Sequence, residues 1–395
     1  MKRIIFILLI LLVVCSCNKK TPAEDKKTES TFKLQTNDTN VEYAKKVYLH
    51  DLINDFDREK IISENILLDT YSLGKHIQKI EYSVENEIIT ENIEYNVVDT
   101  TKPLLLVSSS YTITKGSNTN LVNKAICADN YDKRPNCYIE GDYDVNTVGT
   151  YNLIYNAIDS SNNKSSKIFK LKVVKPTKDK KVTTNKPKFK IQDLIKKHKT
   201  DKTMIGIDVS SWQGNVDYKK VKDSGVEFVM IRLGYGHNKE GKLVLDNQFK
   251  NNIKNAKKEG LLVGLYFFSY ANTIDKVKEQ VNYIVKNLDG EKLDLPIAFD
   301  WENWSKFNTY NVSLTDMKII CQTFIDEVKK NGYDGMLYSS KYYLEQIWGI
   351  DEFDTWLAHY TDSTSYKGKY KLWQLSNRGK VPGINGDVDL DILYK

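Results

Sequence analysis

The chain is 395 residues long and carries a formal net charge of +6. At about 150 residues per domain, this length predicts two to three domains. A hydrophobic fraction of 41% excludes a wholly disordered or collagen-like chain. The surplus charge lies in one segment, because residues 176–202 hold 10 Lys and 3 Asp, whereas residues 1–175 and 203–395 have net charges of 0 and −1. We therefore expect no basic domain surface and no nucleic-acid partner.

The first residues have the pattern of an export signal. Two basic residues precede an unbroken apolar run over residues 4–14, which is too short to span a bilayer. Cys17 then follows the small residue Ser16, and this arrangement resembles a bacterial lipobox. The resemblance implies a signal peptide ending at residue 17, a lipid on the Cys17 thiol and tethering to the outer face of the cell membrane. Plain secretion is the alternative. The polar composition of residues 18–40 predicts a flexible stalk.

Residues 41–175 predict two β-rich modules, at 41–99 and 100–175, because short alternating runs are separated by turn signals. A weak repeat supports this division. Residues 69–74 and 144–149 each lead through a glycine into an alternating strand, a polar hairpin and a closing Val-Val strand. The modules resemble the bacterial immunoglobulin-like modules of surface proteins, the second more closely than the first. Such all-β sandwiches serve as spacers or, alternatively, bind the wall. No constellation of acidic residues in them suggests a calcium site.

Three cysteines follow the signal. Cys127 and Cys137 are ten residues apart within one predicted module, and they either close a small loop or remain two unpaired thiols. Cys321 lies in an amphipathic helical pattern and reads as a small buried apolar residue. No spacing indicates zinc, so we expect no metal and no cofactor. The sequence does not indicate an oligomeric state.

The Lys-rich residues 176–202 predict a solvated linker. Attraction to anionic wall polymers or lipid headgroups is the alternative function of this charge. Phe189 is the only aromatic residue in the segment, which gives nucleic-acid bases little to stack on.

From Thr203 onward, apolar runs of strand length alternate with amphipathic helical stretches, which predicts an α/β fold with a parallel sheet. The expected strands are 204–209, 228–233, 261–268, 296–301, 335–338, 355–359, 371–374 and 388–393, and the expected helices are 247–258, 274–287 and 314–330. Residues 203–395 hold about eight expected strands, but the segment is shorter than a full barrel of about 250 residues. We therefore expect a compact barrel with reduced helices.

Four carboxylates fall where a barrel places its chemistry. Asp208 ends the first strand, Asp300 and Glu302 end the fourth, and Asp389 belongs to the last. The carboxyl ends of parallel barrel strands share one face, and residues at i and i+2 of a strand point the same way. Two adjacent carboxylates push their pKa values apart, so one can stay protonated while the other is ionised. This combination suits the cleavage of a glycosidic bond.

Residues 203–395 resemble glycoside hydrolase family 25, the N-acetylmuramidase lysozymes. The matching stretches are 206–236 (GIDVSSWQG and onward), 245–271, 295–303 (LPIAFDWEN), 356–360 (WLAHY) and 372–394. The resemblance implies a barrel of about five βα units plus three strands. It further implies cleavage of the β-1,4 bond between N-acetylmuramic acid and N-acetylglucosamine, with peptidoglycan as partner. A non-catalytic wall-binding lipoprotein with a lectin-like barrel is the alternative.

The resemblance also implies roles for single residues. Glu302 matches the proton donor, and Asp300 matches a carboxylate that is either the nucleophile or the orienter of the substrate's 2-acetamido group. Asp208 and Asp389 match the two flanking acids. The motifs that line the family's sugar groove cover Tyr266, Tyr338, Trp373 and Gln374.

The sequence also singles out an arginine, two tryptophans and a short stretch of the third strand. Arg232 is expected to have a structural role. Trp301 and Trp304 either stack on sugar rings or belong to the core. Where many family members have Tyr-His-Phe on the third strand, this chain has Tyr-Phe-Phe at residues 266–268, which bears on substrate contacts near the cleft.

Overall fold

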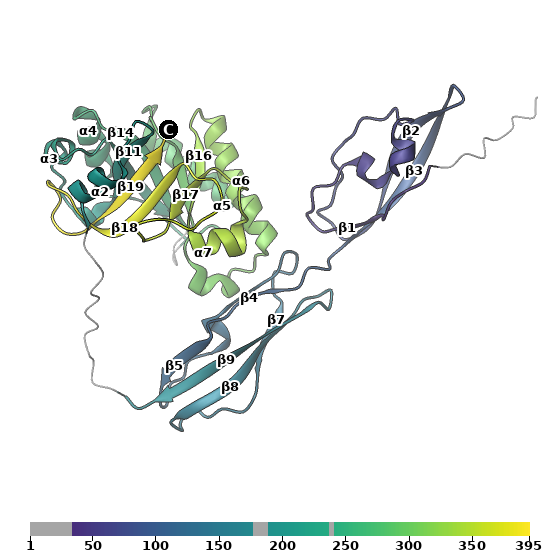
Figure 1. Cartoon of the computed structure of the whole chain (residues 1–395), viewed down its shortest axis with the longest axis horizontal. Helices are drawn as coiled ribbons and strands as arrows, with labels where there is room; N and C mark the ends of the chain where they lie inside the picture. Colours follow the sequence, from purple (N-terminus) through teal and green to yellow (C-terminus); the bar gives the residue numbers. More distant parts are fainter. Residues whose placement is uncertain (1–33, 177–188, 237–240) are drawn as a thin grey trace, which may run out of the picture. The chain divides into compact units, whose positions relative to one another are not determined.

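The computed structural model describes residues 34–176, 189–236 and 241–395 (Figure 1). The predicted signal peptide, Cys17 and most of the predicted stalk lie outside these ranges. No helix among the described residues is long and apolar enough to cross a membrane. The chain divides into two compact units, of which one includes residues 47–68 and 76–95, and the other residues 96–395 with 40–46 and 69–75.

The first β-rich module contains a three-stranded sheet in the order β1-β3-β2. Its elements are β1 (Asn40–Glu42), η1 (Leu49–Leu52), α1 (Asp55–Arg58), β2 (Gly74–Val84) and β3 (Glu87–Val98). The predicted hairpin is present, and it turns at Glu85 and Asn86, both with positive φ, as two-residue hairpins require. The predicted stalk ends too late, because Leu34 is buried and Thr36 forms a β-bridge with Ile53.

The second β-rich module has a four-stranded sheet in the order β5-β9-β8-β7 and a two-stranded sheet β4-β6. Its elements are β4 (Leu104–Leu106), β5 (Ser110–Thr114), η2 (Val122–Lys124), β6 (Ile126–Ala128), β7 (Asn136–Glu140), β8 (Gly149–Ile158) and β9 (Lys164–Val174). Tyr155, Phe169 and Leu171 form its buried core. A disulfide joins Cys127 of β6 to Cys137 of β7, and therefore links the two sheets.

The predicted linker at residues 176–202 extends too far toward the C-terminus. β10 (Phe189–Lys190) pairs with a barrel strand, and α2 (Ile191–His198) follows it directly. Ile191 and Leu194 are buried on one face of α2, while its lysines lie on the other side. The high lysine content concealed this amphipathic helix, whose apolar residues recur at helical spacing.

The C-terminal domain is a closed barrel of eight strands. They are β11 (Thr203–Val209), β12 (Phe228–Gly236), β14 (Leu262–Ser269), β15 (Ile297–Asp300), β16 (Gly335–Ser340), β17 (Thr355–Ala358), β18 (Leu372–Lys380) and β19 (Val388–Tyr394). Neighbours from β11 to β18 pair in parallel. β19 pairs antiparallel with both β18 and β11, and this closes the barrel. All eight predicted strands are present, although β18 continues beyond the predicted end at Gln374.

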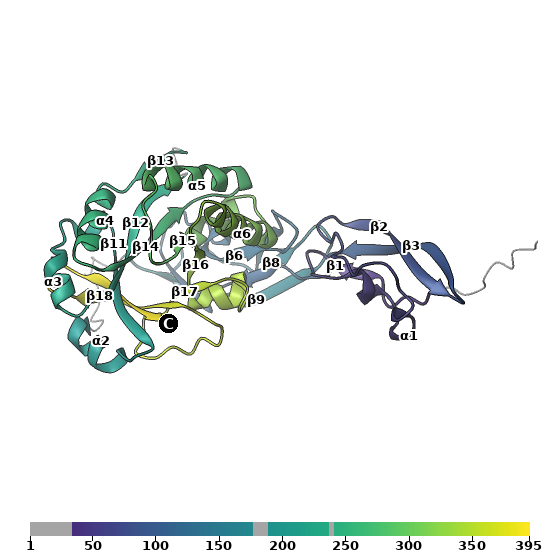
Figure 2. The same ribbon diagram turned by 90° about the horizontal axis from the view of Figure 1, so that it is seen from above.

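Helices surround the strands on the outside (Figure 2). They are α3 (Tyr218–Asp223), α4 (Phe249–Lys258), α5 (Ile274–Leu288), α6 (Leu314–Lys330), α7 (Lys341–Tyr343) and a π-helical turn at Leu344–Trp348. Short turns η3 (Ser211–Gln213) and η4 (Trp304–Thr309) and the strand β13 (Leu243–Leu245) complete the domain. The three predicted helices correspond to α4, α5 and α6.

Side chains fill the barrel in alternation along each strand. On β12, Phe228 and Met230 belong to one core cluster, whereas Val229 and Ile231 belong to another. Gly206 on β11 faces Phe228, and a Cβ at this glycine would lie 2.3 Å from the Phe228 ring. The barrel is therefore a packed core, and the room for a substrate lies at the strand ends.

Candidate active site

Carboxyl groups from three strands gather at one end of the barrel. Asp208 lies near the end of β11, Asp300 is the last residue of β15, and Asp389 lies on β19 opposite Asp208 in the strand register. They line a cleft of about 750 Å³ together with Glu302. The cleft is also lined by Ser211, Trp212, Gln213, Arg232, Tyr235, Tyr266, Phe268, Tyr270, Tyr338, Trp356, Tyr360, Gln374, Asn377 and Asp387.

Asp300 and Glu302 lie in different surroundings although they are two residues apart. Asp300 is buried, and its Oδ1 has no hydrogen-bond partner. Burial, followed by the charges of Glu302 and Asp208, raises the pKa of Asp300 well above its usual value, while Arg232 acts in the opposite direction. Glu302 keeps an exposed surface, but the protein atoms around its carboxyl group raise its pKa through desolvation. The cleft thus favours the protonated form of both acids.

Asp208 and Asp389 extend the acidic cluster. Gln374 Nε2 donates a 2.8 Å hydrogen bond to Asp208 Oδ2, and burial and the neighbouring Asp391 raise the pKa of Asp208 well above its usual value. Burial and Asp208 raise the pKa of Asp389 to about 9. Asp389 therefore carries a proton at neutral pH and can donate a hydrogen bond to a sugar, and the pKa of Asp208 is shifted in the same direction.

Asp391 is a fifth acid that the sequence analysis did not select. Its side chain is fully buried, and Trp356 Nε1 donates a 2.9 Å hydrogen bond to its Oδ1. Burial and Asp389 raise its pKa well above the usual range. The alternation of acids at residues 387, 389 and 391, which runs into β19, is the signal that could have found it, since alternate strand residues share a face.

Three of the four predicted groove residues reach the cleft. Gln374 Oε1 accepts hydrogen bonds from Tyr338 Oη at 2.8 Å and from Tyr360 Oη at 3.1 Å. Tyr266 and Tyr338 both pack edge-on against Trp356. Trp356 and Tyr360 were not selected as site residues, although the WLAHY stretch contains both.

Trp373 does not reach the cleft, which corrects the sequence-based expectation. It is 2% exposed, donates through Nε1 to the His359 carbonyl, and packs edge-on against His198 of α2. Because strand residues alternate, Gln374 faces the cleft and Trp373 faces the outer layer. Trp301 and Trp304 are also buried in the outer core, so neither stacks on a substrate.

Trp212 is the aromatic residue most available to a ligand. Its side chain is 84% exposed at the edge of the cleft, on η3 after β11. The sequence analysis quoted this residue within a motif but assigned it no role. The departure from Tyr-His-Phe falls on Phe267, which is fully buried in the outer core and packs against Tyr283. Phe268, by contrast, lines the cleft.

Arg232 combines a structural and an electrostatic role. Its guanidinium group contacts Asp246 Oδ2 through Nη2 at 2.7 Å and through Nε at 2.8 Å, and Nη2 also donates to Ser211 Oγ. These bonds fix the guanidinium group beside the cleft. From there its charge opposes the rise in the pKa of Asp300.

We expect Asp389→Asn to stabilise the fold at alkaline pH. The pKa of Asp389 is about 9 in the folded state against an ordinary 3.8, so its ionisation opposes folding increasingly as pH rises between these values. At about 1.4 kcal/mol per pKa unit, the free energy of unfolding should therefore rise by several kcal/mol at pH 8 and change little at pH 4. Urea unfolding at both pH values measures this difference.

Asp387→Asn is the matched control, since Asp387 lines the same cleft but forms an ion pair with Lys380 at 2.7 Å. It should give no gain at pH 8. Equal effects of Asp389→Asn at pH 4 and pH 8 would contradict the electrostatic explanation.

Comparison with known proteins finds relatives of this barrel. Residues 207–384 match the model of Glycosyl hydrolases family 25. The chain is 31% identical over 191 residues to an autolytic lysozyme of Clostridium acetobutylicum. The aligned region covers 48% of this chain and 55% of the relative. It is 30% identical over 198 residues to lysozyme M1 of Streptomyces globisporus, which covers 47% of this chain and 65% of that protein. The chain thus spans little more than half the length of the first relative.

Among solved structures, a family 25 glycosyl hydrolase from Bacillus anthracis matches with 25% identity and a TM-score of 0.43. That match covers 50% of this chain and 92% of the other.

Proposed function

We propose that the protein hydrolyses the β-1,4 bond between N-acetylmuramic acid and N-acetylglucosamine in peptidoglycan, because residues 207–384 match the model of Glycosyl hydrolases family 25. The observation that carries this proposal is the pair Asp300 and Glu302 at the end of β15. One carboxyl group is buried, the other is open to the cleft, and both have raised pKa values. Glycosidases use such a pair as proton donor and anion.

In the proposed reaction Glu302 is the proton donor. Its raised pKa keeps the carboxyl group protonated, and its exposure to the cleft lets it reach the glycosidic oxygen. Proton transfer to this oxygen releases the N-acetylglucosamine side as the bond to C1 of N-acetylmuramic acid breaks. Glu302 then accepts a proton from the water that completes hydrolysis.

Asp300 supports the positive charge that develops at C1. It does so either as a nucleophile that bonds to C1 or by orienting the 2-acetamido group, whose oxygen attacks C1 instead. Arg232 favours the ionised form that either role requires. Asp208 and Asp389, whose raised pKa values favour the protonated form, bind sugar hydroxyl or carbonyl groups, and Trp212 offers its exposed ring for stacking.

We further propose that the enzyme acts at the cell wall as a lipoprotein anchored through Cys17. The β-rich modules are proposed to be immunoglobulin-like spacers that separate the barrel from the membrane. The two-sheet arrangement of residues 104–174 supports this description of the second module.

Mass analysis of a peptidoglycan digest tests the proposed bond specificity. After borohydride reduction, the products of the purified protein should end in N-acetylmuramitol. Products that end in N-acetylglucosaminitol would identify the other glycosidic bond, and 1,6-anhydro ends would indicate a non-hydrolytic reaction. Binding to peptidoglycan without any product would instead favour the wall-binding alternative.

The same digest, run on separated cell fractions, tests the anchor. Membranes should carry the activity of the wild-type protein, and Cys17→Ser should move it to the soluble or secreted fraction. Unchanged membrane activity in this variant would contradict the anchor without affecting the enzyme assignment.

A further inference from the structure

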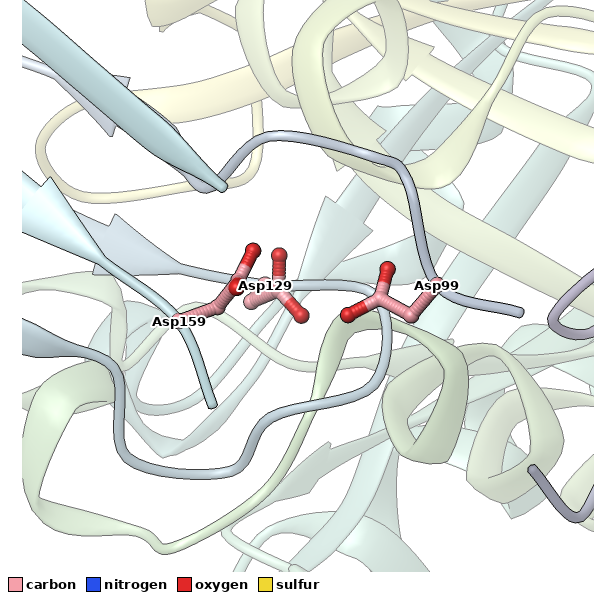
Figure 3. Close-up of side chains that lie close together, drawn as sticks. All are labelled: Asp99, Asp129 and Asp159. Atoms are coloured by element: carbon pink, nitrogen blue, oxygen red, sulfur yellow. The ribbon is translucent and has the colours of Figure 1, made fainter. Parts of the chain in front are cut away.

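Three aspartates from separate loops of the second β-rich module converge on one point (Figure 3). Asp99 follows β3 in the segment that enters the module, Asp129 follows β6, and Asp159 follows β8. One carboxylate oxygen from each lies within 4.8 Å of those from the other two. The side chains are only 7%, 1% and 5% exposed, respectively. The sequence analysis found no such constellation, because each aspartate is thirty residues from the next.

Two oxygens of this cluster have no hydrogen-bond partner. Asp99 Oδ2 and Asp159 Oδ2 are buried and unpartnered, and the third side chain of the cluster, that of Asp129, is a further carboxylate. In the part of the chain that the structure describes, no ion pair joins any of the three aspartates to Lys or Arg. Buried carboxylates without a positive partner are costly, so these orphan oxygens indicate a missing cation.

The repulsion within the cluster agrees with this geometry. Burial raises the pKa of Asp129 to about 6, and the charges of Asp99 and Asp159 add to the rise. Burial also raises the pKa of Asp99. A bound cation would reverse both effects, since it stabilises the ionised carboxylates.

Asn130 supplies a further candidate ligand. One terminal atom of its side-chain amide lies 3.3 Å from both carboxylate oxygens of Asp129 and from Oδ1 of Asp99. With nitrogen at this position, the amide would donate hydrogen bonds to the carboxylates. With oxygen there, it would complete a set of four oxygen-bearing side chains around one point.

We propose that Asp99, Asp129 and Asp159, with the Asn130 amide oxygen, form a calcium-binding site in the second β-rich module. Calcium accepts six to eight oxygen ligands in flexible geometry and is bound by carboxylates and amide oxygens. Zinc is disfavoured by the ligand chemistry, because its sites usually include nitrogen or sulfur donors. Magnesium is disfavoured, because it demands near-ideal octahedral geometry and retains several waters.

The ion cross-links three loops. Asp129 Oδ2 already accepts from the backbone N–H groups of Tyr131 and Asp132, and Asp159 Oδ1 accepts from that of Asn163. Asp129 and Asp159 thus each organise their own loop, and calcium would join these loops to the entering segment at residues 99–103. Extracellular calcium sites bind with Kd values on the order of 10⁻⁴ to 10⁻³ M.

Hydrogen exchange on the full chain, first stripped with a chelator, tests the site. With 10 mM calcium chloride, exchange at residues 99–103, 129–132 and 159–163 should slow about tenfold, as expected when the ion exceeds a millimolar Kd tenfold. Magnesium chloride at the same concentration should have a much smaller effect. In equilibrium dialysis, the wild-type protein should bind a calcium ion that the Asp159→Asn variant does not bind.

Asp159→Asn should abolish this calcium response. Because it removes like-charge repulsion, it should leave the calcium-free melting temperature unchanged or raised, so loss of response is not loss of fold. Asp142→Asn, at an exposed position of the same module, is the control and should respond like wild type. No protection of these loops in wild type, equal protection by magnesium, or a full response in Asp159→Asn would each overturn the proposal.

Discussion

Glu302→Gln should lower kcat on purified peptidoglycan by about 10³-fold, within the range that general acid catalysis contributes. Glutamine has almost the same shape as glutamate but cannot transfer a proton to the glycosidic oxygen. Because Glu302 lines the cleft and is not part of the buried core, the melting temperature should stay within about 2 °C of wild type. Release of reducing ends from isolated cell walls measures the rate.

The pH profile separates loss of an acid from loss of binding. Burial raises the pKa of Glu302 above its ordinary 4.5, so its protonated fraction falls only as pH rises through this higher value. Wild-type activity should therefore decline on the alkaline side, and the residual activity of Glu302→Gln should lack this decline. Glu327→Gln, at a carboxylate on α6 paired with Lys330, is the control and should keep the wild-type profile. Full activity in Glu302→Gln would show that another group donates the proton.

Most of the barrel could be predicted from the sequence because its signals are local. The strand that ends at Asp300 is a short apolar run, and α6 begins and ends at the predicted residues, Leu314 and Lys330. The resemblance to family 25 placed Gln374 in the sugar groove, and both Gln374 and Asp389 line the cleft. These features depend on neighbours within a few residues, so a single sequence carries them.

The features that sequence analysis missed depend on contacts between distant segments. Asp391 reads as an ordinary strand residue until β19 closes the barrel and buries it against Trp356. Trp373 reads as a sugar-stacking residue until α2, from the supposed linker, covers it. Asp99 and Asp159 each look like a turn aspartate, and only the fold brings them together. In the sequence around these residues, no local pattern distinguishes them from other aspartates and tryptophans of the chain.

The acidic residues in and beside the cleft lower the stability of the fold. Asp208, Asp389 and Asp391 all have pKa values raised by burial and by one another. A neutral residue at any of them would remove repulsion, so stability alone does not account for three adjacent acids. The arrangement fits a site that holds protons and binds a polar substrate, and such a site lowers the stability of the fold.

Asp300→Asn should reduce kcat by about 10²- to 10³-fold, because the amide cannot carry the negative charge that either proposed role requires. Two substrates distinguish the roles: peptidoglycan with N-acetylated muramic acid and the same material after N-deacetylation. If Asp300 orients the acetamido group, N-deacetylation of the substrate should lower the wild-type kcat by about the same factor as Asp300→Asn does. N-deacetylation should then lower the kcat of Asp300→Asn no further.

If Asp300 is the nucleophile, the attacking group belongs to the enzyme and the two losses should add, since each removes a different contribution. Asp387→Asn, in the same cleft and without a proposed catalytic role, should respond to N-deacetylation like wild type. An unchanged rate in Asp300→Asn on both substrates would remove Asp300 from the mechanism. In that case the orphan Oδ1 and raised pKa of Asp300 would reflect burial alone, and the support for positive charge at C1 would have to come from another of the cleft acids.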